Sequence, residues 1–132
     1  MTTCQRSRRE VLTLFGAVVA AGALPRTSHG EAEMFGVISK IKSTADQRQA
    51  LIAILIEGSM AMPGCLSYVV AKDAAEADAL WVTEIWENRE RHQASLALPS
   101  VQQAIAKGRP LIAGFAARFE TLPIGGQGLS AA

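Results

Sequence analysis

One segment in the C-terminal half of the chain, WVTEIWENRERHQ, concentrates residue types that could transfer a proton. It holds both tryptophans of the 132 residues, Trp81 and Trp86, together with Glu84, Asn88 and His92. Histidine exchanges a proton near neutral pH, and an indole offers a flat apolar wall with one N–H donor. The segment therefore offers a candidate proton acceptor beside a flat apolar wall, with His92 and Trp86 as candidate catalytic residues and Glu84 and Asn88 as candidate substrate-binding residues.

These side chains need elements that bring them together. Residues 80–86 (LWVTEIW) predict a β-strand, and Asn88 is a good N-cap for the helix that follows. Alternate strand residues share a face, so one face carries Val82, Glu84 and Trp86 and the other carries Trp81, Thr83 and Ile85. His92 lies one helical turn before Leu96, which should face the sheet. We therefore expect His92, Trp86 and Glu84 around one cavity.

Structural roles remain open for the same residues. A tryptophan at a strand end also suits a core, and a partly buried helix histidine can bond a backbone carbonyl. Glu84 could pair with Arg118 or Arg109 across the sheet edge, because a buried carboxylate needs a partner or a proton. Three further residues are interpreted structurally: Trp81 and Tyr68 as core or dimer interface, and Cys65 as an inert buried thiol.

The order of elements predicts the fold. We expect a strand at 34–42, a helix from a cap at Ser43 or Thr44 to about Met60, strands at 66–71 and 80–86, a helix after Asn88, a second short helix from Pro99, and a strand at 115–122. The first helix should bury a stripe of Leu51, Ile52, Leu55, Ile56 and Met62. The order β-α-β-β-α-β is that of a ferredoxin-like α+β fold, an antiparallel sheet with helices on one face.

The N-terminal residues 1–30 predict an export signal. They carry four arginines and one glutamate, a net charge of +3, whereas residues 31–132 carry nine basic and eleven acidic residues, a net charge of −2. Ser7-Arg8-Arg9-Glu10-Val11-Leu12 resembles the twin-arginine signal and precedes an apolar run at 14–24 that is too short to span a bilayer. An N-terminal anchor helix is the alternative. Export predicts a periplasmic or extracellular domain at 31–132, associated with the membrane only through the signal.

The remaining composition excludes several classes of function. The mature domain would lack a basic excess, which argues against nucleic-acid binding. It would keep one cysteine, Cys65, so no internal disulfide could form. Its histidines and cysteines show no metal-ligand spacing, and we expect no metal.

The domain resembles the antibiotic biosynthesis monooxygenase family, including its quinol monooxygenase branch. The residues that carry the resemblance are PGCLSY (63–68), WVTEIWE (81–87), HQASLALP (92–99) and RPLIAGF (109–115). The resemblance implies a dimeric α/β barrel of two face-to-face sheets, with a pocket between sheet and helices in each subunit. It also implies oxygenation of a small aromatic or quinol by molecular oxygen without a cofactor.

The resemblance leaves a second class of function open. The same pocket could serve a non-catalytic binding or stress-response module for an aromatic or haem-like ligand. A related haem-degrading branch uses an asparagine on the first strand, but the strand here reads FGVISKIK. That branch also has a longer spacing between its tryptophan and histidine than the six residues from Trp86 to His92, so haem breakdown is disfavoured.

Overall fold

The computed structural model describes residues 33–129. The predicted signal at 1–30 lies outside this range. The described elements are β1 (Phe35–Ser43), α2 (Arg48–Gly58), β2 (Cys65–Lys72), β3 (Ala79–Trp86), α3 (Arg89–Ser95), α4 (Pro99–Gly108), the 3-10 helix η1 (Arg109–Leu111) and β4 (Ile112–Thr121). The order is the predicted β-α-β-β-α-β, with the second helical segment divided into α3 and α4 where Pro99 begins a new helix.

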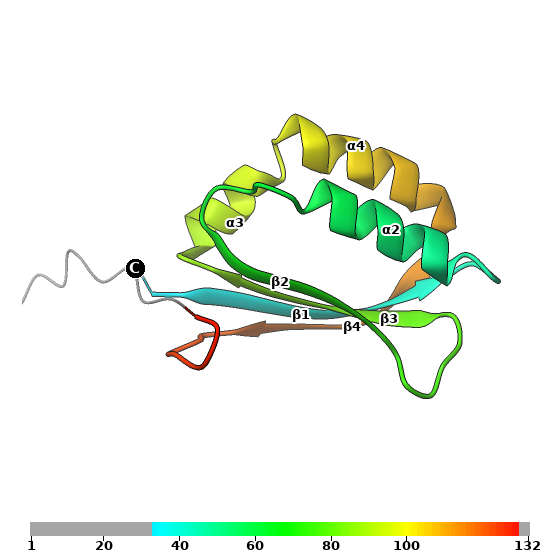
Figure 1. Cartoon of the computed structure of the whole chain (residues 1–132), viewed down its shortest axis with the longest axis horizontal. Helices are drawn as coiled ribbons and strands as arrows, with labels where there is room; N and C mark the ends of the chain where they lie inside the picture. Colours follow the sequence, from blue (N-terminus) through cyan, green and yellow to red (C-terminus); the bar gives the residue numbers. More distant parts are fainter. Residues whose placement is uncertain (1–32, 130–132) are drawn as a thin grey trace, which may run out of the picture. The chain divides into compact units, whose positions relative to one another are not determined.

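The four strands form one antiparallel sheet in the order β2-β3-β1-β4. The helices lie on one face of this sheet, and the other face is left uncovered by the described residues (Figure 1). This arrangement confirms the ferredoxin-like α+β fold.

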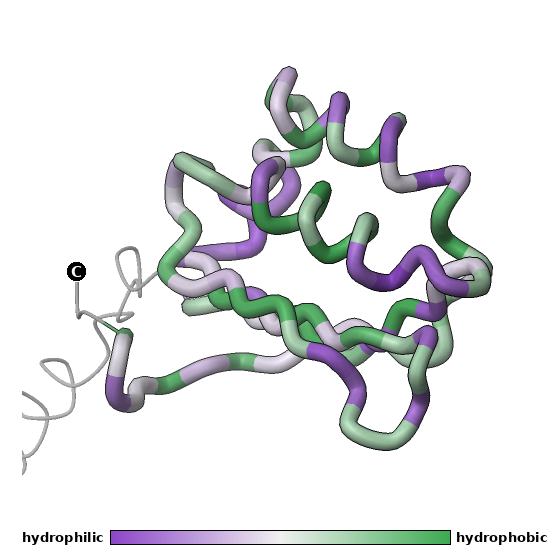
Figure 2. Tube along the Cα trace, turned by 45° about the vertical axis from the view of Figure 1, so that its right-hand side comes forward, coloured by the Kyte–Doolittle hydropathy of each residue, from purple (hydrophilic) through white to green (hydrophobic). Residues whose placement is uncertain are grey.

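The core lies between the sheet and the helices. One cluster of buried residues comprises Ile41, Leu51, Ile52, Leu80 and Val82. A second cluster comprises Phe35, Val37, Met62 and Trp86. The strand members of both clusters recur at every second position, as expected for one face of a pleated sheet. In Figure 2, hydrophobic and hydrophilic stretches alternate along α2 and α4, as expected for helices with one side against a sheet.

The predicted start of the first helix was wrong. Ser43 ends β1, and its hydroxyl donates a hydrogen bond to the carbonyl of Asp78 instead of capping a helix. Asp46 has a positive φ of 61°, which interrupts a helical path, and α2 begins only at Arg48 without a side-chain cap. The capping-box pattern failed because the hairpin residue Asp78 offers the serine hydroxyl a tertiary acceptor.

The predicted end of the first helix and the start of the last strand also shift. Helix α2 ends at Gly58, so Met62 reaches the core from the following turn, and Ile56 lies about half exposed instead of inside. Strand β4 begins at Ile112, three residues before the predicted start at Phe115. Here η1 turns the chain directly into the sheet, so little loop separates helix from strand.

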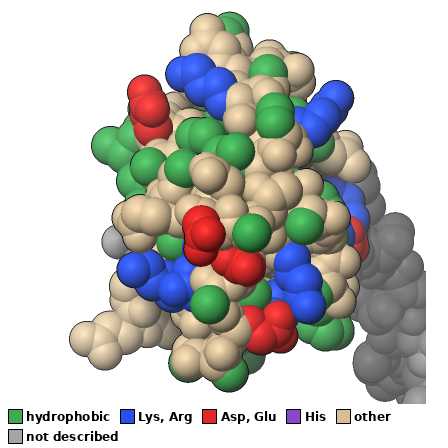
Figure 3. All heavy atoms as spheres, turned by 90° about the vertical axis from the view of Figure 1, so that its right-hand side faces the viewer, with side chains coloured by type: hydrophobic (Ala, Val, Ile, Leu, Met, Phe, Trp, Pro, Cys, Tyr) green, Lys and Arg blue, Asp and Glu red, His purple; other side chains and the backbone are tan. Residues whose placement is uncertain are grey.

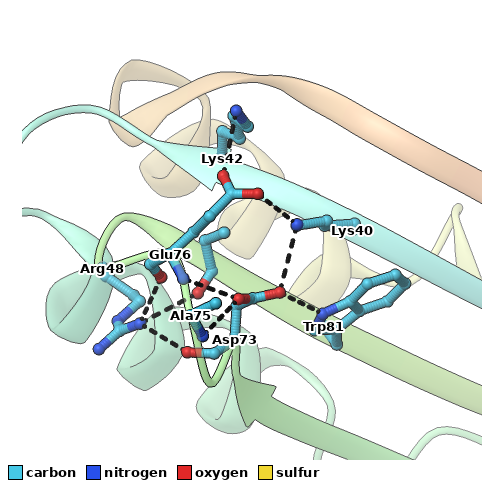
Figure 4. A network of polar contacts seen from close by, with 8 residues as sticks. Lys40, Lys42, Arg48, Asp73, Ala75, Glu76 and Trp81 are labelled. Atoms are coloured by element: carbon cyan, nitrogen blue, oxygen red, sulfur yellow. Dashed lines mark hydrogen bonds and ion pairs between the residues drawn. The ribbon is translucent and has the colours of Figure 1, made fainter.

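The uncovered sheet face carries a polar network at one end, around the loop between β2 and β3 (Figure 4). Asp73 accepts hydrogen bonds from the indole N–H of Trp81 at 2.8 Å and from the amides of Ala75 and Glu76 at 2.9 and 2.8 Å. Lys40 binds Asp73 at 3.2 Å and lies 5.6 Å from the centre of the Trp81 ring. Trp81 therefore belongs to this network and not to either core cluster.

Arg48 attaches the start of α2 to the same loop. Its Nη1 donates to the carbonyls of Asp73, Glu76 and Ala79 at 3.4, 3.0 and 3.2 Å. One side chain thus bridges three backbone carbonyls of the hairpin, and those of Glu76 and Ala79 also accept backbone amides of the hairpin itself.

Charges of both signs are mixed on the molecular face seen in Figure 3, which shows no single-sign patch. Within residues 33–129, no helix is both long and apolar enough to cross a membrane.

Candidate functional site

A cavity of about 490 Å³ lies between the sheet and the helices. Apolar side chains from β1, β3, α2 and α4 form most of its walls. Its fully buried lining residues include Val82, Leu51 and Trp86, whereas Leu96, Ile105 and Phe115 are exposed at its edge. The cavity therefore has a closed inner end at Trp86 of β3 and a rim where residues of α4 and β4 are exposed. Its volume lies in the range of small-molecule sites.

The inner end brings together three of the four predicted site residues. Trp86 donates its indole N–H to Oε2 of Glu84 at 2.9 Å, which the strand period allows because the two residues share a face. Nε2 of His92 lies 3.7 Å from the same Glu84 oxygen. The imidazole also meets the Trp86 ring edge-on, with the ring centres 5.5 Å apart. All three side chains line the cavity.

Burial decides the charge state of His92. Its side chain is only 11% exposed. Burial lowers the pKa of His92 below its ordinary value, because an imidazolium is poorly solvated there. Glu84 opposes this effect by its negative charge, and Arg118 adds to it by its positive charge. His92 is therefore neutral at neutral pH and is able to accept a proton.

The structure does not bring Asn88 to the cavity. Its backbone is extended, and its side-chain oxygen accepts a hydrogen bond from the amide of Arg91 at 2.8 Å. Asn88 is thus the N-cap of α3, as its position before the helix predicted, and it does not appear among the residues that line the cavity. Its role as a substrate contact stays a prediction without a supporting contact.

Glu84 does not pair with either arginine that the sequence suggested. Among the described residues, its carboxylate has polar contacts with the side chains of Trp86 and His92. Arg118 instead lies 4.0 Å from Glu120. Cross-strand pairing explains the difference, because Glu84 stands opposite Val37 and Tyr68, while Arg118 stands opposite Ser39.

Tyr68, which the sequence interpretation assigned to the core or an interface, packs against both core clusters and also lines the cavity. It lies opposite Glu84 in the β2–β3 pair and lines the cavity beside it. Burial raises the pKa of Tyr68, so its phenol stays protonated and can donate a hydrogen bond. The strand register would have identified it, since a residue opposite Glu84 must share its face.

Metal ligands are not clustered in the described part of the chain. Residues 33–129 contain no group of three or more His, Cys, Asp or Glu side chains placed to hold a metal ion. Cys65 is half-buried, and burial raises the pKa of its thiol, as expected for an unreactive cysteine.

Comparison with known families and structures identifies relatives of this fold and cavity. Residues 34–107 match the sequence model of the family described as antibiotic biosynthesis monooxygenase. A crystal structure from Chloroflexus aurantiacus J-10-fl, named for the same family, is 59% identical, with a TM-score of 0.72 over 74% of this chain and 99% of that one. An uncharacterized protein of Synechocystis sp. is 30% identical over 80 residues, which cover 58% of this chain. The chain matches only 54% of the length of that curated relative.

A more distant structure shares the fold. A Mycobacterium tuberculosis protein is 22% identical, with a TM-score of 0.61 over 71% of this chain and 98% of its own. At this identity the likeness concerns the fold alone.

Proposed function

Since the chain belongs to the antibiotic biosynthesis monooxygenase family, we propose that it oxygenates a small aromatic or quinol substrate with molecular oxygen, using its own side chains and no cofactor. The observation that carries the proposal is the position of His92, whose side chain is largely shielded from solvent, beside Glu84 and Trp86 in an apolar cavity. The family match supports a monooxygenase by name, and the cavity supports a small-molecule substrate.

His92 would take the hydroxyl proton of the bound quinol. The resulting imidazolium would then face the carboxylate of Glu84, 3.7 Å from Nε2, which favours the charged product of the transfer. Trp86 holds Glu84 in place through its indole N–H and forms a wall against which the ring can lie. His92 is therefore neutral before the proton transfer, and the negative charge of Glu84 stabilises its positive charge afterwards.

Deprotonation makes the ring electron-rich enough to reduce oxygen. An ionised quinol would add O2 at a ring carbon next to the oxygen-bearing carbon, which gives a carbon hydroperoxide after the proton returns from His92. Loss of the ring C–H proton and cleavage of the O–O bond would release water and leave a carbonyl at that carbon. One oxygen atom enters the product and the other leaves as water, and the quinol supplies the electrons. The surrounding apolar walls exclude solvent from this step.

Removing the base tests the proposal. His92→Ala should lower oxygen consumption with a quinol panel by about 100-fold, the usual scale for loss of a general base. Gln93→Ala is the matched control, because Gln93 lies on the same helix but is exposed and does not line the cavity. Wild-type turnover by a folded His92→Ala protein would show that His92 is structural.

A binding module is the second candidate. It is favoured by one observation: the indole N–H of Trp86 is already bonded to Glu84, so this donor is not available to a substrate. Oxygen electrode traces separate the two functions. A protein that binds quinols without consuming oxygen belongs to the second class.

The proposal includes export by the twin-arginine route to the periplasm or beyond, and a homodimer built on the uncovered sheet face. Export rests on the SRREVL motif, which lies outside the described residues. Replacing Arg8 and Arg9 with Lys should retain the precursor in the cytoplasm, and normal processing of that variant would contradict the route.

A further inference from the structure

The cavity is electrostatically asymmetric. Its charged lining residues include Glu84 at the inner end, and Arg109 and Arg118 from η1 and β4. Both arginines are exposed, in contrast to Glu84, whose side chain is 15% exposed. A ligand in this cavity would therefore meet a negative charge inside and positive charges toward solvent.

The two guanidinium groups retain capacity for a ligand. Within residues 33–129, no carboxylate lies within ion-pair distance of Arg109. Arg118 reaches Glu120 only at 4.0 Å, and Glu120 is held more closely by Arg89 at 2.9 Å. A second anion could therefore bind at the rim without displacing a strong internal ion pair.

The sheet register fixes how far this rim lies from the inner carboxylate. Glu84 stands opposite Val37 on β1, which stands opposite Glu120 on β4, and Arg118 is two residues from Glu120. Two strand spacings and a two-residue offset place the Cα atoms of Glu84 and Arg118 roughly 12 Å apart. Both side chains stand on the helix-covered face of the sheet, so a separation of this size is comparable to the length of a hydroxyaromatic acid with a polar contact at each end.

We propose that the substrate is an anionic hydroxyaromatic, whose carboxylate or similar anion binds Arg118 and Arg109 at the rim while its hydroxyl group points to His92 at the inner end. This inference rests on the proposed aromatic-binding role of the cavity and names its substrate class. Glu84 enforces the orientation, because a carboxylate at the inner end would meet a like charge. Arg118 and Arg109 are then specificity-determining residues that act in binding.

An independent electrostatic link supports this orientation. The charge of Arg118 reaches His92 and contributes to the lowering of its pKa. An anion bound to Arg118 would offset this effect and make the base stronger when the substrate is present. Binding of the anion at the rim would thus raise the pKa of His92 at the inner end.

Binding without oxygen tests the inference separately from turnover. The probes are para-hydroxybenzoate and its uncharged analogue para-hydroxybenzyl alcohol, titrated anaerobically by calorimetry. The wild type should bind the benzoate about tenfold more tightly, the order expected from one charge-assisted hydrogen bond at a partly exposed site. Arg118→Gln and Arg109→Gln should each reduce this preference, and Arg118→Lys should retain part of it.

Lys107→Gln is the matched control, because it also removes one positive charge but lies outside the cavity lining, on an exposed position of α4. The Lys107→Gln protein should prefer para-hydroxybenzoate over the uncharged alcohol by the same factor as the wild type. Equal affinity of the wild type for both probes, or an unchanged preference in both arginine variants, would overturn the inference. Since no oxygen is present, a failure to oxygenate quinols would refute the proposed function while leaving a measured anion preference intact.

Discussion

At the scale of residues, the indole N–H of Trp86 provides the anchor for the Glu84 carboxylate, at 2.9 Å. Trp86→Phe keeps an aromatic wall but removes this donor. We expect the free energy of unfolding to fall by about 1–3 kcal/mol, because a largely buried carboxylate loses a partner, and the oxygenation rate to fall because Glu84 is no longer fixed beside His92. Denaturant unfolding and oxygen uptake measure the two effects.

Trp81→Phe is a matched control for this change. Trp81 also donates its N–H to a carboxylate, that of Asp73 at 2.8 Å, but it lies on the opposite sheet face. The Trp81→Phe protein should have a lower free energy of unfolding, but its folded form should oxygenate substrate at the wild-type rate. Equal rate losses in both variants would mean that the Trp86–Glu84 bond has no specific role in the site.

The titration of His92 gives a second prediction. Burial lowers its pKa, Glu84 and Glu120 raise it, and Arg118 and Arg89 lower it further, with a net shift below the ordinary value of 6.5. A neutral base is needed, so the acid limb of the rate profile should have its midpoint below pH 6.5. Below that pH the unfolded chain binds the proton first, so stability should decline with falling pH until the folded His92 is itself protonated.

An NMR titration of the His92 ring, assigned by comparison with His92→Ala, measures this pKa directly. Glu84→Gln should lower it further, because the variant removes the neighbouring negative charge. An acid limb clearly above pH 6.5 would contradict a buried neutral base.

The period of a strand made part of this site predictable. Glu84 and Trp86 share a face by alternation, and His92 follows one turn into the next helix, so the structure brings them together as expected. The sequence could not show that Trp86 would bind Glu84 or that Arg118 would join the lining, because both facts depend on rotamers and cross-strand register.

At the scale of elements, the seven-residue helix α3 depends on its cap to position His92. Asn88 satisfies the amide of Arg91 at the start of this helix. Asn88→Ala should lower the free energy of unfolding by about 1 kcal/mol, whereas Asn88→Ser should retain most of it because serine also caps helices. Urea unfolding measures the difference. A raised KM with unchanged stability in Asn88→Ala would instead support substrate binding by this residue.

Element order was more predictable than element ends. Alternating apolar residues specified the strands, and Pro99 specified the start of α4. The start of α2 was not predictable from the local sequence. The Ser43 hydroxyl could have capped a helix, but it bonds the carbonyl of Asp78, which lies 35 residues away in the chain. Local chemistry alone does not decide whether this hydroxyl accepts from a helix amide or donates to a distant carbonyl.

At the scale of the whole molecule, the uncovered sheet face predicts a homodimer. A row of residues crosses the four strands on this face: Val69, Thr83, Ile38 and Phe119. Val69 is 52% exposed and Phe119 is 55% exposed. Burying such a face contributes about 25 cal/mol for each Å² of apolar surface. Light scattering should therefore find a dimer at micromolar concentration and a monomer for Phe119→Glu.

Ile56→Glu is the control for that substitution, because Ile56 is similarly exposed but lies on helix α2, on the other side of the sheet. It should remain dimeric. A monomeric wild type, or dissociation of both variants alike, would remove the sheet face as the dimer interface.

The loop from Asp73 to Asp78 has the composition of a segment that proteases cut easily, with charged and small residues at the surface. Asp73 and Arg48 nevertheless hold its backbone amides and carbonyls from two sides (Figure 4). A protease needs an extended, freely opened backbone, which these bonds prevent unless several break together. Cleavage of this loop would therefore report on the joint loss of the Asp73 and Arg48 contacts, and its rate would measure how often they break together.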